Sequence, residues 1–107
     1  MLLGQVIGQL AGEDVAAEAL LGIGNLALVV EVDAVADTFG ETRAIYAAGA
    51  VRRYVQQAGD DDWLALMTAL ERAEDPASAC LEKMLGWSLR RDKAMARPIE
   101  LRRLERA

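Results

Sequence analysis

Apolar residues recur every three or four positions along most of this chain, which is the spacing of an amphipathic helix. The first such face is formed by four residues: Leu3, Val6, Ile7 and Leu10. Glu13 and Asp14 then place negative charge in the first turn of a second helix, where the helix dipole favours it. Glycine commonly ends helices, so we expect this second helix to end at Gly22 or Gly24.

The segment 26–32, with the sequence LALVVEV, fits either a buried strand or a helix. Its β-branched residues are typical of strands. We favour a helix because Asn25 is a good N-cap and because the apolar spacing continues beyond the length of a typical strand. The apolar positions that continue the pattern are Leu28, Val32, Val35 and Phe39. Gly40 is expected to end this helix.

Two more helices are predicted in the middle of the chain. The first covers residues 42–57 and stops at Gly59, with an apolar side formed by Ala44, Ala48, Val51 and Val55. The second starts at the aspartates 60–62 and has the apolar stripe Trp63, Leu66, Met67 and Leu70. We interpret the three aspartates as a helix cap, because a calcium loop needs alternating ligands and a central glycine. Trp63, next to them, is a candidate for the mouth of a ligand groove.

Asp75 and Pro76 predict the start of a further helix, since aspartate caps well and proline is tolerated at the first helical position. Its apolar face would consist of Cys80, Leu81, Met84, Leu85 and Trp87. Pro98 is expected to separate this helix from the last segment of the chain. The pattern as a whole predicts an all-α fold, a small antiparallel bundle of about five helices over residues 1–93. Residues 94–107 would form a short basic tail, either a docked helix or mobile.

Charge is divided unevenly along the chain. Residues 1–89 contain 5 Lys and Arg against 14 Asp and Glu, whereas residues 90–107 contain 7 against 3. The basic residues of this second part are Arg90, Arg91, Lys93, Arg97, Arg102, Arg103 and Arg106. We expect them to bind an acidic protein surface, on the same subunit or on a symmetry mate. Arginines also bind phosphates, but this part of the chain has no aromatic residue for stacking on bases, so we do not favour nucleic acid.

Small residues indicate close helix packing. Alanine accounts for 20 of the 107 residues, and alanine favours helix but buries little area. Gly4, Gly8 and Gly12 repeat at four-residue spacing and are interpreted as a helix-packing face within or between subunits. We therefore expect a homo-oligomer, with a dimer preferred, and leave room for a heterologous protein partner.

The residue inventory excludes several kinds of site. The chain has no histidine and one cysteine, so zinc clusters and histidine general bases are excluded within one chain. Cys80 is interpreted as an inert core thiol, which fits a reducing cytoplasm. No signal peptide or membrane helix is expected, because the longest apolar run, residues 20–30, is interrupted by Gly22, Gly24 and Asn25.

Carboxylates are the remaining candidates for chemistry. Five of them are spaced as magnesium ligands on facing helices would be: Glu31, Asp33, Glu71, Glu74 and Asp75. Acidic helices produce such spacing by chance, so a Mg²⁺-dependent hydrolase is an alternative hypothesis, and a nucleic-acid binder using the arginines is another. The favoured prediction is a non-catalytic interaction or regulatory protein that has no cofactor.

Overall fold

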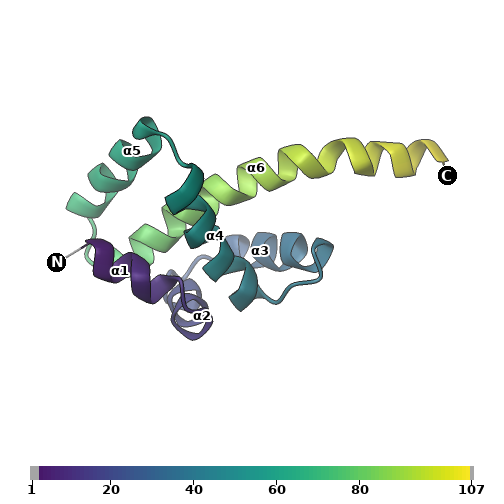
Figure 1. Cartoon of the computed structure of the whole chain (residues 1–107). Coiled ribbons are helices and arrows are strands. Elements are labelled where there is room, and N and C mark those ends of the chain that lie inside the picture. Colours follow the sequence, from purple (N-terminus) through teal and green to yellow (C-terminus); the bar gives the residue numbers. More distant parts are fainter. Residues whose placement is uncertain (1–2, 107) are drawn as a thin grey trace.

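The computed structural model of the chain describes the backbone of residues 3–106 and the side chains of residues 3–94. This part contains six helices and no strands (Figure 1). The helices are α1 (Leu3–Leu10), α2 (Glu13–Gly22), α3 (Leu26–Thr38), α4 (Arg43–Gln57), α5 (Asp60–Glu71) and α6 (Pro76–Arg106). The predicted all-α fold of about five helices is confirmed.

Short polar side chains fix where several helices begin. Asn25 Oδ1 accepts a hydrogen bond from the Leu28 N–H at 3.1 Å, and this cap starts α3. The ambiguous segment 26–32 is therefore helix, as favoured. Thr42 caps α4 in the same way, through the Ile45 N–H at 3.2 Å. Between these two helices Gly40 adopts a φ of 70°, a left-handed conformation that suits glycine and ends α3 as predicted.

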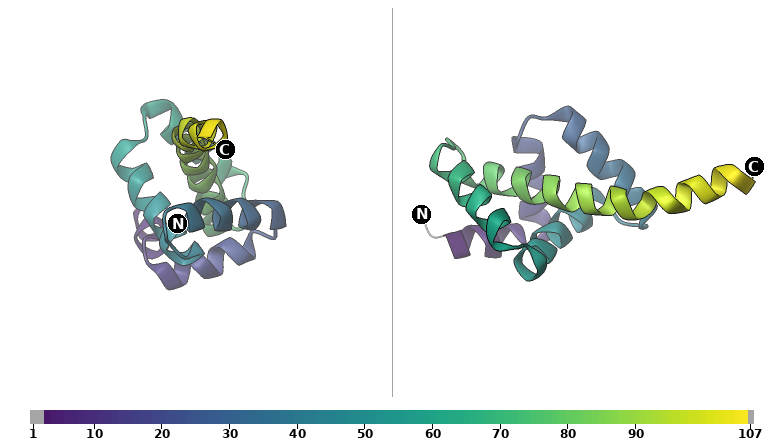
Figure 2. Two further views of the ribbon diagram at one scale, coloured as in Figure 1. Left: turned by 90° about the vertical axis from the view of Figure 1, so that its right-hand side faces the viewer. Right: turned by 90° about the horizontal axis from the view of Figure 1, so that it is seen from above.

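The core is centred on α4 and α6. Helices α2 and α3 pack against both of them, α5 packs against α6, and α1 covers α2 (Figure 2). Because neighbours lie on several sides of α4, residues 46–51 are buried without interruption. The predicted apolar side of this helix is wrong in part: Ala48 and Val51 are buried, but Val55 is 46% exposed. Tyr46 and Tyr54 take the positions that face the other helices.

The outer helices bury narrower faces than α4. On α3, Leu28 and Val32 are buried as predicted, whereas Phe39 lies at the C-cap and is 52% exposed. On α5, Leu66 is buried and Met67 is exposed. The apolar face predicted for α6 is confirmed, since all of its members are buried: Cys80, Leu81, Met84, Leu85 and Trp87.

Helix α6 is the longest element and runs through Pro98 to Arg106. The predicted separation at Pro98 is wrong, because the backbone is helical on both sides of this residue. The proline removes one backbone hydrogen bond and crowds the carbonyl four residues earlier, but the helix continues past it. Residues 94–106, hereafter the α6 extension, project away from the other helices in each view from the side and above (Figures 1 and 2). The molecule accordingly measures 52 × 28 × 21 Å along its principal axes. Within the described residues, no helix combines the length and the apolar character needed to cross a membrane.

Candidate functional site

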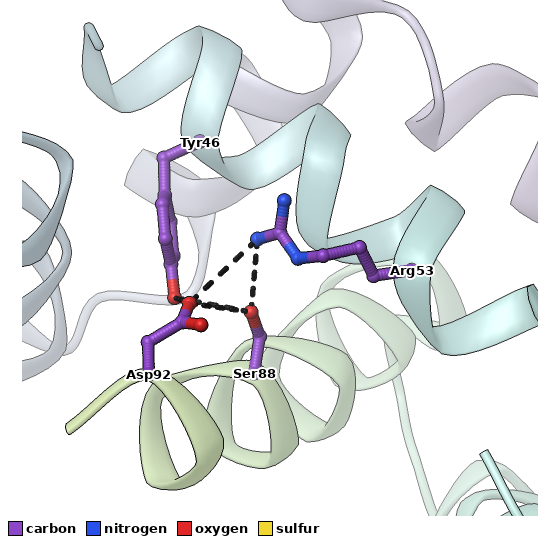
Figure 3. Close-up of polar contacts among 4 residues, drawn as sticks. All are labelled: Tyr46, Arg53, Ser88 and Asp92. Carbon is purple, nitrogen blue, oxygen red and sulfur yellow. Dashed lines mark hydrogen bonds and ion pairs between the residues drawn. The ribbon is translucent and has the colours of Figure 1, made fainter. Parts of the chain in front are cut away.

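Four polar side chains meet where α4 crosses α6 (Figure 3). Tyr46 and Arg53 lie seven residues apart on α4, and Ser88 and Asp92 lie four residues apart on α6. Both spacings place side chains on one face of a helix. The crossing therefore brings two local pairs together from opposite sides.

The four side chains form a closed hydrogen-bonded network. The Tyr46 hydroxyl donates to Asp92 Oδ2 at 2.5 Å and lies 3.0 Å from the Ser88 hydroxyl. Arg53 Nη2 donates to Ser88 Oγ at 3.0 Å and lies 3.9 Å from Asp92 Oδ2. Ser88 Oγ is 3.3 Å from the same carboxylate oxygen. Within the described residues, every buried side-chain nitrogen and oxygen has a hydrogen-bond partner.

The burial of Tyr46 and the glycine at position 49 both affect this network. Burial, together with the hydrogen bond to Asp92, raises the pKa of the Tyr46 hydroxyl far above its ordinary value. The Arg53 guanidinium lies over the Tyr46 ring, 5.2 Å from its centroid. It fits there because Gly49 has no side chain: a Cβ at that position would lie 2.9 Å from Arg53 Nη1.

The network holds helices together, and its two hydroxyl groups are closed to solvent. Tyr46 is fully buried and Ser88 is 1% exposed, so neither hydroxyl can reach a molecule in solvent. No nucleophile and base are arranged toward an open site here. The chemical effect of the arrangement is to fix the position of α6 on α4 just before the α6 extension begins.

A groove of 390 Å³ separates α5 from α6. Its lining combines small residues, two aromatic rings and four charged residues. The lining residues are Tyr54, Asp62, Ala65, Ala69, Ala79, Glu82, Lys83, Gly86, Trp87 and Arg90. Trp63, the predicted candidate for the mouth of a groove, packs edge-on against Tyr54, with ring centroids 5.0 Å apart.

A hydrogen bond and ring contacts hold the floor of the groove, and its edge carries charge. The Tyr54 hydroxyl donates to the backbone carbonyl of Asp62 at 2.5 Å, and burial raises the pKa of Tyr54 to about 12. The Trp87 ring packs edge-on against Tyr54, with centroids 5.1 Å apart, and Arg91 lies over the Trp87 ring at 4.6 Å. Lys83 and Arg90 lie on one side of α6, seven residues apart, with Gly86 between them.

The five carboxylates considered as magnesium ligands do not meet. Asp33 accepts two hydrogen bonds from Arg43, at 3.0 and 2.7 Å, and Glu31 pairs with Lys93 at 3.2 Å. Glu71 and Glu74 are exposed near the start of α6. Among the described side chains, no three acidic, histidine or cysteine residues are grouped to hold a metal ion.

Asp75, the fifth carboxylate, caps α6 as predicted. Its Oδ1 accepts from the Ser78 N–H at 3.4 Å, and its Oδ2 accepts from the Ser78 hydroxyl at 2.7 Å. These bonds to the charged form lower the pKa of Asp75. At the start of α5 the aspartates also lie in the first turn, and Asp62 Oδ2 accepts from the Gly59 N–H at 3.0 Å.

The predicted partner-binding arginines are described only in part. Arg90 and Arg91 are exposed on α6, whereas Arg97, Arg102, Arg103 and Arg106 lie outside the described side chains. Within the described residues, no atom outside their own helix backbone lies within 4 Å of where a Cβ on Gly4 or Gly8 would be, and Gly12 is the N-cap of α2. Cys80 is buried, and burial raises the pKa of its thiol to about 11, as suits an inert core residue.

The polar network and the groove were not predicted from the sequence. The signals available were the seven-residue spacing of Tyr46 and Arg53 and the presence of Ser88 within an apolar face. Neither signal says which helices face each other. Comparison of the chain with protein families, with curated proteins and with solved structures finds no match.

Proposed function

We propose that this protein is a non-catalytic interaction protein that works as a homodimer and presents the α6 extension to its partner. The observation that carries the proposal is the path of α6, which leaves the acidic body as a projecting basic helix (Figure 1). Residues 1–89 have a formal charge of −9, from 5 basic and 14 acidic residues, and residues 90–107 have +4, from 7 and 3.

The α6 extension would gain stability from a partner. Its 13 residues project from the body, and most of the stability of helices in proteins comes from packing of a helix face rather than from intrinsic propensity. Contact with a surface of opposite charge would stabilise the α6 extension, and the body of a second copy supplies such a surface. Two copies can satisfy each other in the same way, as in the two-fold symmetric dimers that are the commonest oligomers.

The body is built to hold the α6 extension in one direction. Ser88 and Asp92, six and two residues before the extension starts, bind α4, and Lys93 pairs with Glu31 of α3 at 3.2 Å. Two different helices thus restrain α6 at the point where it leaves the body. Such restraint lowers the entropy cost of binding, which favours a role in recognition.

Native mass tests the proposal. Size exclusion with light scattering at low and high salt should give twice the chain mass of 11.6 kDa, and the dimer should weaken as salt rises because opposite charges are screened. The triple variant Arg102→Glu, Arg103→Glu, Arg106→Glu should be monomeric under conditions where the wild type is a dimer. Arg52→Glu, at an exposed position on α4, is the matched control. A wild-type monomer at all concentrations would contradict the proposal.

Simple binding experiments test the two other predicted functions. Salt-dependent binding of the wild type to random duplex DNA, lost in the triple variant, would favour a nucleic-acid binder instead. Heat on titration with Mg²⁺ would support the hydrolase, although Glu31 and Asp33 already pair with basic residues. The cytoplasm remains the proposed location, supported by a single, buried thiol.

A further inference from the structure

We infer that the α6 extension of one copy lies antiparallel in the groove between α5 and α6 of the other copy. This inference rests on the homodimer proposed above and assigns its contact surface. The two copies would exchange equivalent contacts around a two-fold axis, so each groove holds the partner's extension.

The groove and the α6 extension match in length. The residues of α6 that line the groove run from Ala79 to Arg90, which is 12 residues, or about 17 Å at 1.5 Å per residue. The extension contains 13 residues, 94–106. An antiparallel alignment that places Ala94 beside the partner's Arg90 therefore brings the end of the extension beside the partner's Ala79.

The shape of the groove suits a helix. Ala65 and Ala69 of α5 lie one turn apart and face Ala79 and Gly86 of α6 across the groove. Side chains this small allow a third helix to approach two others closely, since the separation of packed helices depends on the side chains between them. The aromatic floor of Tyr54 and Trp87 supplies apolar surface beneath.

Charge selects the antiparallel direction. Glu82 lines the groove near its Ala79 end, and Glu71, Glu74 and Asp75, at the end of α5 and in the connection to α6, are exposed there as well. These four carboxylates outnumber the two cations of the same region, Arg72 and Lys83. The arginine positions 102, 103 and 106 reach this acidic end in the antiparallel alignment. The uncharged residues 94–96 then lie beside Arg90. A parallel alignment would instead bring the arginines toward Arg90 and Arg91.

A charge exchange tests the contact directly. In the alignment above, Arg102 lies beside the partner's Glu82. Glu82→Arg should raise the dimer dissociation constant by roughly tenfold or more, and the double variant Glu82→Arg with Arg102→Glu should restore it. Glu18→Arg is the matched control, since Glu18 is exposed on α2 away from the groove. Circular dichroism of each variant shows that the helical content is retained.

A crosslink tests the alignment independently. Residues 82 and 102 are 20 positions apart on one helix, about 30 Å, whereas a disulfide needs Cα atoms within about 7 Å. Under mild oxidation the variant Glu82→Cys with Arg102→Cys should therefore form only dimers linked between copies. Glu82→Cys with Ala94→Cys, which is out of alignment by eight residues, should not crosslink.

The outcomes separate this inference from the proposal beneath it. A wild-type chain that is monomeric would overturn the homodimer itself. A wild-type dimer that neither responds to Glu82→Arg nor crosslinks through 82 and 102 would overturn the groove contact while leaving the homodimer intact. Gly86→Leu adds a third measurement: it fills the groove without harming helix propensity, and it should weaken the dimer.

Discussion

Helix α6 takes part in two interfaces that share one local arrangement of residues but differ in whether they are closed. In the α4–α6 interface Arg53 follows Gly49 by four residues, and in the α5–α6 interface Arg90 follows Gly86 by four. In both pairs the guanidinium lies where the glycine leaves room, with Nη1 at 2.9 and 3.5 Å from the absent Cβ. The first interface is closed over the buried Tyr46 and Ser88, and the second is an open groove.

The difference lies in what faces each arginine. Arg53 meets Ser88 and Asp92 on the opposite helix, and Tyr46 completes their hydrogen bonds. Arg90 lines the groove with three small side chains, Ala65, Ala69 and Ala79, which fill little space, and with the carboxylates Asp62 and Glu82. The polar residues of the first interface therefore complete one another's hydrogen bonds, whereas those of the second line a space that is open to a further chain.

The largest expected effect comes from the closed interface. Tyr46→Ala removes a fully buried ring and should cost about 3–5 kcal/mol of unfolding free energy, as large-to-small core changes do. Tyr46→Phe keeps the ring but leaves Asp92 and Ser88 short of a partner, at a cost of about 1–3 kcal/mol. Urea denaturation followed by circular dichroism measures both. The exposed Met67→Ala should change little, and a Tyr46→Phe variant as stable as the wild type would contradict a stabilising network.

Alkaline titration compares the two interfaces through one tyrosine each, since the chain has only two. Burial raises the pKa of Tyr46 and Tyr54 in the folded chain above the unfolded value of about 10. The contribution of each protonated hydroxyl to the unfolding free energy is therefore fully present below pH 10. It is lost as pH rises through the folded pKa, which is about 12 for Tyr54. In Tyr46→Phe the tyrosinate absorbance should appear at lower pH than in Tyr54→Phe. A midpoint near 10 with helix intact would show that neither hydroxyl is protected.

Substitution of Gly49 and of Gly86 should change stability in different ways, by smaller amounts. Gly86→Ala should stabilise the chain by about 0.5–1 kcal/mol through helix propensity, because its Cβ would meet Arg90 at an ordinary contact distance of 3.5 Å. Gly49→Ala should gain less or lose stability, because its Cβ would displace the Arg53 guanidinium from Ser88. Thermal or urea unfolding measures the difference, and repeating both changes in an Arg53→Ala background should abolish it.

The smallest effect is expected at the cap of α6. Hydrogen bonds from Ser78 lower the pKa of Asp75 below its unfolded value, so the charged cap stabilises α6 above about pH 4 and loses this effect as pH falls through the folded pKa. Asp75→Ala should therefore lower the melting temperature slightly at pH 7 and by less at pH 3. Asp75→Asn, which can still accept from Ser78, is the control. A difference that does not depend on pH would contradict a charge effect.

The sequence alone determined the local structure of this protein. Asn25, Thr42 and Asp75 mark helix starts because their oxygens reach backbone N–H groups three residues away, and Gly40 ends a helix because it tolerates a positive φ. The buried face of α6 was also readable, since its apolar residues repeat at helical spacing over one contiguous stretch. These features depend on residues within a few positions of one another.

Only the tertiary structure decided which helix faces which. Ser88 and Asp92 form their hydrogen bonds with Tyr46 and Arg53, which lie 35 to 46 residues away. Asp33 is an ion-pair partner rather than a metal ligand because Arg43 folds back on it. The exposure of Val55 and the groove beside Gly86 likewise follow from where the neighbouring helices lie. Spacing along a helix determines which side chains share a face, but whether that face is buried depends on helices that are distant in the sequence.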